Sequence, residues 1–196
     1  MPETDDRPYV AGAAAGVVAW AFGYVVTYLL AASEIRESSL NRIVELLEGD
    51  PATHELVGWV FFNAHFVDIV FEGLPAVGSQ ATSFVGGENG LTPLLYLLPV
   101  VALLATGLAL ARATGATTAA AGAVAGLTAT SGYLLASVIG VVLFEVSAAG
   151  ATGAPETVPA IAVAGLAYPA VLASAGGAVA GATADRDSPE RRDPGT

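Results

Sequence analysis

The chain has 196 residues, of which 54% are hydrophobic and only 13% are charged, whereas a soluble domain averages roughly 25% charged residues. Its 18 acidic and 7 basic side chains give a net charge of -11, and all the basic residues are arginines. The sequence has no cysteine, no lysine and no methionine beyond Met1, which excludes disulfides, thiolate–metal centres, Schiff bases and methionine-ligated haem. We therefore expect a membrane protein with no cofactor and no metal. Nucleic acid is not an expected partner, because its phosphates need clustered cations.

Five apolar segments are long enough to cross a bilayer, which takes ~20 helical residues. They are Val10–Ala32, Leu56–Leu74, Leu91–Ala111, Thr117–Ser147 and Thr157–Thr183. The fourth is longer than a bilayer requires, so it is expected to tilt or to project at one end. The pattern predicts an all-α integral membrane helical bundle with five transmembrane helices, forming one domain over residues 1–184. A polar, disordered tail is expected over residues 185–196.

The arginines predict the orientation, because cytoplasmic segments of membrane proteins carry an excess of positive charge. With five spans and the N-terminus outside, six of the arginines lie on the cytoplasmic side and only Arg7 lies outside. If the segment 56–74 does not span, four helices remain, and the better orientation places the N-terminus inside with the arginines divided 5 to 2. The larger bias favours a cell-membrane protein with five spans, an outer N-terminus and a cytoplasmic C-terminus.

The connection Ser33–Glu48 predicts a short cytoplasmic amphipathic helix that lies at the membrane interface or packs under the bundle. Its apolar residues at helical spacing are Leu40, Ile43, Val44 and Leu47. The run Gly49-Asp50-Pro51 ends it. Helices that lie on a membrane surface usually carry basic residues, so the acidic character of this one argues against binding to anionic lipid by charge.

Three of the segments contain glycines four residues apart. The pairs are Gly12/Gly16, Gly122/Gly126 and Gly177/Gly181. Glycines at this spacing share one helix face and let another backbone approach closely. We expect the fourth and fifth segments to pack tightly against each other, and the first to pack tightly at its own pair. The same motif also suits homo-oligomerisation or a partner within a membrane complex.

A polar stripe on the second segment is the candidate functional feature. In a continuous helix, His65, Asp68 and Glu72 project within roughly 80° of one another. An ionised carboxylate near the bilayer centre costs about 2.5–3.5 kcal/mol on insertion scales, so the stripe is expected to face the bundle interior or a wet cavity. One hypothesis is a pathway for protons, cations or a small solute along these three residues.

The alternative is that the stripe only hydrogen-bonds to other helices. Suitable partners at similar depth are Tyr24, Ser131, Tyr133 and Tyr168. The protein is then a structural or assembly subunit with no chemistry of its own.

A metal site and an enzyme active site are not expected. The stripe extends over roughly 10 Å along the helix, too far for its three residues to close on one ion. A third hypothesis, a membrane-embedded hydrolase, would pair Ser131 with His65. However, serines in the middle of a helix more often hydrogen-bond a preceding carbonyl. We therefore expect no enzymatic activity.

The acidic termini, the exclusive use of arginine and the helices rich in Ala, Gly and Val resemble small multi-pass membrane proteins of extreme halophiles. Acidic exposed surface keeps such proteins soluble and monomeric. The resemblance is one of composition over the whole chain and implies no functional residue. Between the two main hypotheses, the sequence favours a transporter-like or channel-like protein over a structural subunit.

Overall fold

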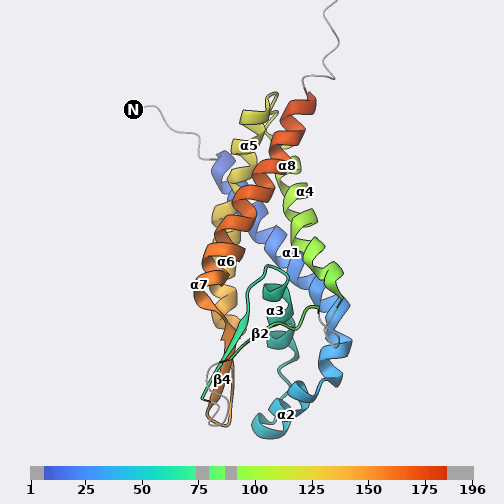
Figure 1. Cartoon of the computed structure of the whole chain (residues 1–196). Helices are drawn as coiled ribbons and strands as arrows, with labels where there is room; N and C mark the ends of the chain where they lie inside the picture. The colour runs from blue at the N-terminus through green and yellow to red at the C-terminus, as the bar shows by residue number, and fades with distance from the viewer. Residues whose placement is uncertain (1–6, 74–79, 87–91, 185–196) are drawn as a thin grey trace, which may run out of the picture.

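The computed structural model describes residues 7–73, 80–86 and 92–184 and shows a mostly helical chain whose long helices run side by side (Figure 1). In chain order, the elements are α1 (Arg7–Glu37), α2 (Ser39–Glu48), α3 (Thr53–Asn63), β1 (Ile69–Glu72), β2 (Gln80–Thr82), the 3₁₀ helix η1 (Pro93–Tyr96), α4 (Leu97–Ala113), α5 (Ala119–Leu127), α6 (Ala129–Leu143), β3 (Val146–Ala148), β4 (Ala151–Pro155), α7 (Thr157–Pro159), the π-helix η2 (Ala160–Ala167) and α8 (Tyr168–Ala184).

Four stretches of the described chain are long and apolar enough to cross a membrane. They are Tyr9–Glu37, Pro93–Ala113, Ala119–Leu143 and Thr157–Ala184. In the third stretch α5 and α6 follow each other directly, and in the fourth α7, η2 and α8 do the same. Their length and composition are compatible with a location in the membrane.

The expected span Leu56–Leu74 is not one helix, so the prediction of five spans is wrong at this segment. α3 has only 11 residues, which correspond to about 17 Å of helical rise and to about half of a bilayer core. Phe66 then adopts a φ of 59°, and the chain continues as the extended strand β1. The apolar residues of β1 are β-branched or aromatic and suit a strand. The hydrophobicity is continuous across α3 and β1, so it predicted one long helix where there are two short elements.

Asn63 fixes the reversal of the chain after α3. Its Nδ2 donates a hydrogen bond to the carbonyl of Val67 at 2.6 Å, and its Oδ1 accepts one from the backbone N–H of Phe84 at 2.7 Å. The carbonyl of Phe62 accepts from the backbone N–H groups of both His65 and Val67. The turn is therefore closed by hydrogen bonds within the protein.

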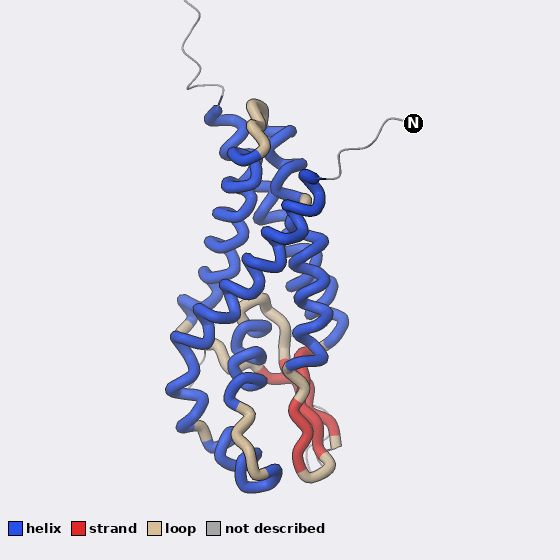
Figure 2. The backbone as a smooth tube through the Cα atoms, turned by 180° about the vertical axis from the view of Figure 1, so that it is seen from behind, coloured by secondary structure: helices blue, strands red, loops and turns tan. Residues whose placement is uncertain are grey.

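A four-stranded antiparallel sheet lies beyond α3 at one end of the molecule (Figure 2), so the expectation of an all-α protein is also wrong. The strand order is β2-β1-β4-β3. In the β3–β4 hairpin, Ala149 and Gly150 have φ angles of 50° and 83°, and two positive φ angles are what a type I′ hairpin turn requires. The fourth expected segment, which extended to Ser147, leaves the helix at Leu143 and enters this hairpin.

α1 begins and α8 ends at the same end of the bundle, near the turn between α4 and α5 (Figure 1). The sheet and α2 lie at the opposite end. The start of α1 and the end of α8 therefore lie together at one end of the bundle, and the orientation with an outer N-terminus and a cytoplasmic C-terminus stays a prediction. The tail 185–196 lies outside the described residues.

Glycines bring the long helices into backbone contact. A Cβ on Gly122 of α5 would overlap the backbone of Gly177 in α8, and one on Gly16 of α1 would overlap the carbonyl of Ala129. The remaining glycines of the three motifs are Gly12, Gly126 and Gly181, which lie against Thr128, Ala173 and Thr118. Side chains larger than hydrogen have no space at these contacts, so the helices touch without an aqueous gap at these points.

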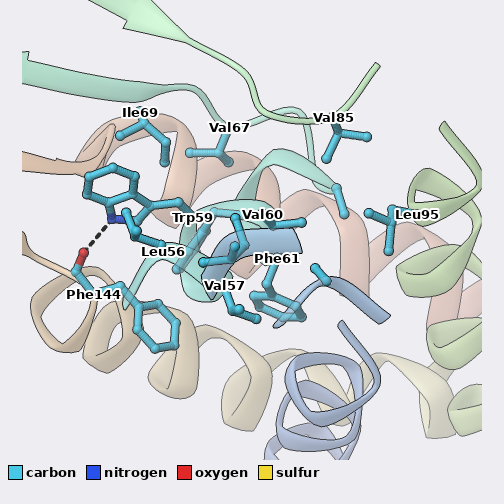
Figure 3. Close-up of a cluster of buried hydrophobic side chains, with 14 of the residues drawn as sticks. Leu56, Val57, Trp59, Val60, Phe61, Val67, Ile69, Val85, Leu95 and Phe144 are labelled. Atoms are coloured by element: carbon cyan, nitrogen blue, oxygen red, sulfur yellow. Dashed lines mark hydrogen bonds between the residues drawn. The ribbon is translucent and has the colours of Figure 1, made fainter. Parts of the chain in front are cut away.

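The core is centred on α3, which lies inside a ring of helices, strands and loops (Figure 3). Val57, Val60 and Phe61 are almost fully buried. Trp59 is also buried, and its indole Nε1–H donates to the carbonyl of Phe144 at 2.6 Å. This bond ties α3 to the residue where α6 ends and the chain turns toward the sheet.

Candidate functional site

The three residues of the predicted stripe do not share one face. His65 lies in the turn after α3 and is completely buried, whereas Asp68 and Glu72 are exposed, just before β1 and at its last residue. The backbone of Asp68 belongs to the sheet region, where its carbonyl accepts from the N–H of Glu156 at 2.9 Å. Because α3 ends at Asn63, helical spacing does not bring the side chains of His65, Asp68 and Glu72 onto one face.

The turn that carries His65 reaches into the helical bundle. Its imidazole lies against Tyr133 of α6, and Tyr133 is ten residues from the end of α6 at Leu143, which is roughly 15 Å of helical rise. α3 therefore enters the helical bundle from the sheet end, and the chain reverses at the turn that carries His65. This turn is held against α6 by Tyr133 and against α8 by Tyr168.

Both nitrogens of His65 have a hydrogen-bond partner. Nδ1 lies 2.8 Å from the carbonyl oxygen of Phe61, which only accepts, so Nδ1 carries the proton in the neutral ring. Nε2 is then the acceptor, and the hydroxyl of Tyr133 donates to it at 2.7 Å. The rings of Phe61 and Tyr168 complete the enclosure, with centroids 4.7 and 5.2 Å from that of His65. The two hydrogen bonds together fix the tautomer of His65 with its proton on Nδ1.

Burial also determines the charge of His65, which lies outside the four candidate spans. Removal of the ring from water disfavours the imidazolium and lowers the pKa of His65 from 6.5 to about 4, although the hydrogen bond to the Phe61 carbonyl acts in the opposite direction. His65 is therefore neutral near pH 7. Its bonds and its charge state suit a structural role in the turn.

The other expected partners of the stripe are engaged elsewhere. The hydroxyl of Tyr24 donates to the carbonyl of His54 at 3.1 Å. Ser131 is exposed, and its hydroxyl donates to the carbonyl of Thr128 at 3.2 Å. The structure therefore does not bring Ser131 and His65 together as a nucleophile and base.

Two buried hydroxyls on α6 have no hydrogen-bond partner in the described part of the chain. They belong to Thr130 and Ser137, which lie three residues before and four after Tyr133 and so share its side of α6. Ser137 lies against the π-helix η2 at Gly165. Neither hydroxyl bonds the carbonyl of the preceding helical turn, which is the usual arrangement for such residues.

No group of three or more metal-ligating side chains is found among residues 7–73, 80–86 and 92–184. Sequence reasoning missed Asn63, the residue that shapes this site. The only local signal was an amide side chain in the middle of an apolar run, because its second partner, Phe84, lies 21 residues further along the chain.

Among the described residues, the acidic side chains lie at one end of the molecule. Every acidic residue that the structure describes lies on the segments around α2, α3 and the sheet: Glu34, Glu37, Glu45, Glu48, Asp50, Glu55, Asp68, Glu72, Glu145 and Glu156. All are exposed except Glu55, which is half-buried. Within the described residues of this end, the accompanying cations are Arg36 and Arg42. We call this part of the molecule the acidic end.

The comparison with known proteins identifies a family. Residues 2–184 match the model of a family described as "Family of unknown function (DUF7978)". The chain belongs to this family. No curated protein and no solved structure matches the chain. The family's description assigns no function, and the resemblance to membrane proteins of extreme halophiles stays a prediction.

Two features of the described residues bear on function. One is the occluded His65–Tyr133 pair in the bundle, and the other is the exposed acidic end.

Proposed function

We propose that the protein is a four-span membrane protein with a structural or assembly role, which holds the acidic end at the membrane surface for a partner. The observation that carries this proposal is the contrast in exposure along the predicted stripe. His65 is fully occluded with both nitrogens hydrogen-bonded, whereas Asp68 and Glu72 are exposed at the sheet. The interior is built to hold helices together, and the charged groups face outward at one end.

The arginines support an orientation for this role. With four spans, Arg7, Arg112 and the three arginines that follow α8 in sequence belong to one side, and Arg36 and Arg42 belong to the other. This division of 5 to 2 favours cytoplasmic chain ends by the positive-inside rule. The acidic end is then extracytoplasmic.

Transport through His65, Asp68 and Glu72 remains a prediction for a flux measurement, but the geometry supports it less well. A pathway needs groups that exchange protons or ions along one accessible line. His65 is enclosed by Phe61, Tyr133 and Tyr168, and its low pKa makes it a poor proton carrier near pH 7. The exposed carboxylates lie beyond the turn rather than beside the ring.

Two measurements test the proposal. The first is proton and cation flux in liposomes, in which wild-type protein and the Asp68→Asn variant should both match empty liposomes. Flux that appears with wild type and falls with Asp68→Asn would establish transport and overturn the proposal. The second is the size of the protein in a mild detergent extract of its own membranes, which should exceed that of the purified protein. Equal sizes would remove the assembly role.

A further inference from the structure

α2 buries only part of its apolar surface. Val44 is buried and Leu40 is half-buried, and these residues attach the helix to the rest of the protein. Ile43, Leu46 and Leu47 occupy the adjoining arc of the helix at spacings of three and four residues. They are 52%, 85% and 54% exposed. The rest of the protein therefore covers only part of the apolar face of α2. We call the exposed residues Ile43, Leu46 and Leu47 the α2 ridge.

The ridge is held in a fixed orientation. Ser38 caps the start of α2 by accepting from the N–H of Asn41, and Gly49 ends it with a φ of 90°. Glu48 accepts a hydrogen bond from the N–H of Ala149 in the β3–β4 turn at 3.1 Å, which ties the end of α2 to the sheet. A helix anchored at both ends presents its exposed side chains without a large further loss of entropy on binding.

The lipid bilayer is a poor occupant of the ridge. α2 lies at the far end of the molecule, beside the outer part of the sheet and beyond the start of α4 (Figures 1 and 2). Exposed Glu45, Glu48 and Asp50 lie on α2 and directly after it. Carboxylates at this density are repelled by anionic lipid headgroups, where a surface-binding helix needs cations.

A second copy of the chain is also a poor occupant. An isologous contact through α2 would bring two acidic ends together, each with ten described carboxylates against Arg36 and Arg42. Like charges placed face to face cost several kcal/mol in an interface. The net charge of the acidic end therefore favours a partner of the opposite sign, and Arg42, one helical turn before Leu46, is the exposed cation beside the ridge.

We propose that the α2 ridge docks an amphipathic helix of another protein, with aliphatic residues on one face and Lys or Arg beside them. This inference rests on the proposed assembly role and names the chemistry of its partner. The aliphatic face packs on Ile43, Leu46 and Leu47, and the cations face the carboxylates of the acidic end. Apolar anchors at spacings of three and four are the usual basis of such helix recognition.

Binding of designed peptides to the purified protein in phosphatidylcholine nanodiscs tests the docking chemistry. The probe is a helical peptide with a leucine face flanked by lysines, and its control carries glutamates in place of the lysines. The lysine peptide should bind wild type at least tenfold more tightly than the glutamate peptide, and Leu46→Ser should lose at least tenfold. Leu94→Ser on η1, where the leucine is 69% exposed, is the matched control and should bind like wild type. Equal binding of the two peptides, or no effect of Leu46→Ser, would overturn the proposal.

The size of the native complex separates this inference from the proposed function. Leu46→Ser should reduce the complex in a mild detergent extract to the size of the purified protein, whereas Leu94→Ser should leave it unchanged. If wild type forms no larger complex, the assembly role fails. If a complex forms and survives Leu46→Ser, the assembly role stands and the α2 ridge is not its docking site. Wild-type protein that purifies as a dimer and becomes monomeric with Leu46→Ser would assign the ridge to a second copy instead.

Discussion

The hydroxyl of Tyr133 donates a hydrogen bond to Nε2 of His65 across 68 residues of sequence, at 2.7 Å and out of contact with water. It joins the turn after α3 to the middle of the long helical stretch Ala119–Leu143. The bond fixes the tautomer of the histidine and the depth to which α3 enters. The bond thus gives His65 a structural role, whereas the sequence pattern suggested a proton pathway through this residue.

Replacing Tyr133 by Phe should destabilise the protein without changing its helix content. The substitution leaves Nε2 of His65 buried without a donor, which costs about 1–3 kcal/mol. The free energy of unfolding in detergent, measured by titration with sodium dodecyl sulfate, checks the value. Tyr9→Phe is the control, because Tyr9 is 65% exposed and its loss of a hydroxyl should be neutral. A Tyr133→Phe variant as stable as wild type would show that the Tyr133–His65 hydrogen bond contributes nothing to the free energy of unfolding.

Acid should weaken the protein through His65. The folded-state pKa is about 4 and the ordinary value is 6.5, so between these values the unfolded chain binds a proton that the folded protein does not. The contribution of His65 to stability is thus complete above about pH 6.5, decreases as the pH falls toward 4, and changes no further below it. The total loss is about 3 kcal/mol.

The difference between wild type and His65→Gln isolates the contribution of His65 to the pH dependence. Unfolding free energies of both proteins are measured from pH 4 to pH 8. Wild type should lose its advantage over His65→Gln progressively as the pH falls below 6.5. A difference that stays constant over this range would contradict a buried neutral His65.

Asn63→Ala should loosen the turn after α3. The change removes the donor to the Val67 carbonyl and the acceptor of the Phe84 N–H, two bonds that hold non-helical backbone inside the protein. Amide hydrogen exchange should become faster at residues 64–69 and at Phe84, with the long helices unaffected. Exchange at wild-type rates would show that the reversal is set by packing alone.

Hydrophobicity identifies the long apolar helices of this fold, because each exceeds the length that a bilayer needs and contains few charges. It fails at α3 and β1, where two short elements add up to the length of a span. The hydrogen bonds that separate them involve Asn63 with Phe84 and His65 with Tyr133, pairs that are distant in sequence and have no local pattern. The shared helix face of His65, Asp68 and Glu72 was predicted wrongly for the same reason, since it depended on a helix continuing past Asn63.

Gly122→Val should separate α5 from α8. A Cβ at this position would overlap the backbone of Gly177, which cannot move aside as a flexible side chain would. The expected loss is several kcal/mol or failure to fold, with a matching decrease in the thermal midpoint in detergent. Ala121→Val is the control, because Ala121 is exposed. A tolerated Gly122→Val would show that these two helices pack less closely than the structure describes.

The four-span orientation can be read from single cysteines, because the natural chain contains none. Ala149→Cys places a thiol in the exposed β3–β4 turn, and Thr117→Cys places one in the exposed connection between α4 and α5 at the other end. An impermeant maleimide added to intact cells should label Ala149→Cys, whereas Thr117→Cys should react only after the membrane is opened. The reverse pattern would place the acidic end in the cytoplasm, against the distribution of arginines. Labelling of both in intact cells would place both ends of the bundle on one side of the membrane, and would contradict the crossing itself.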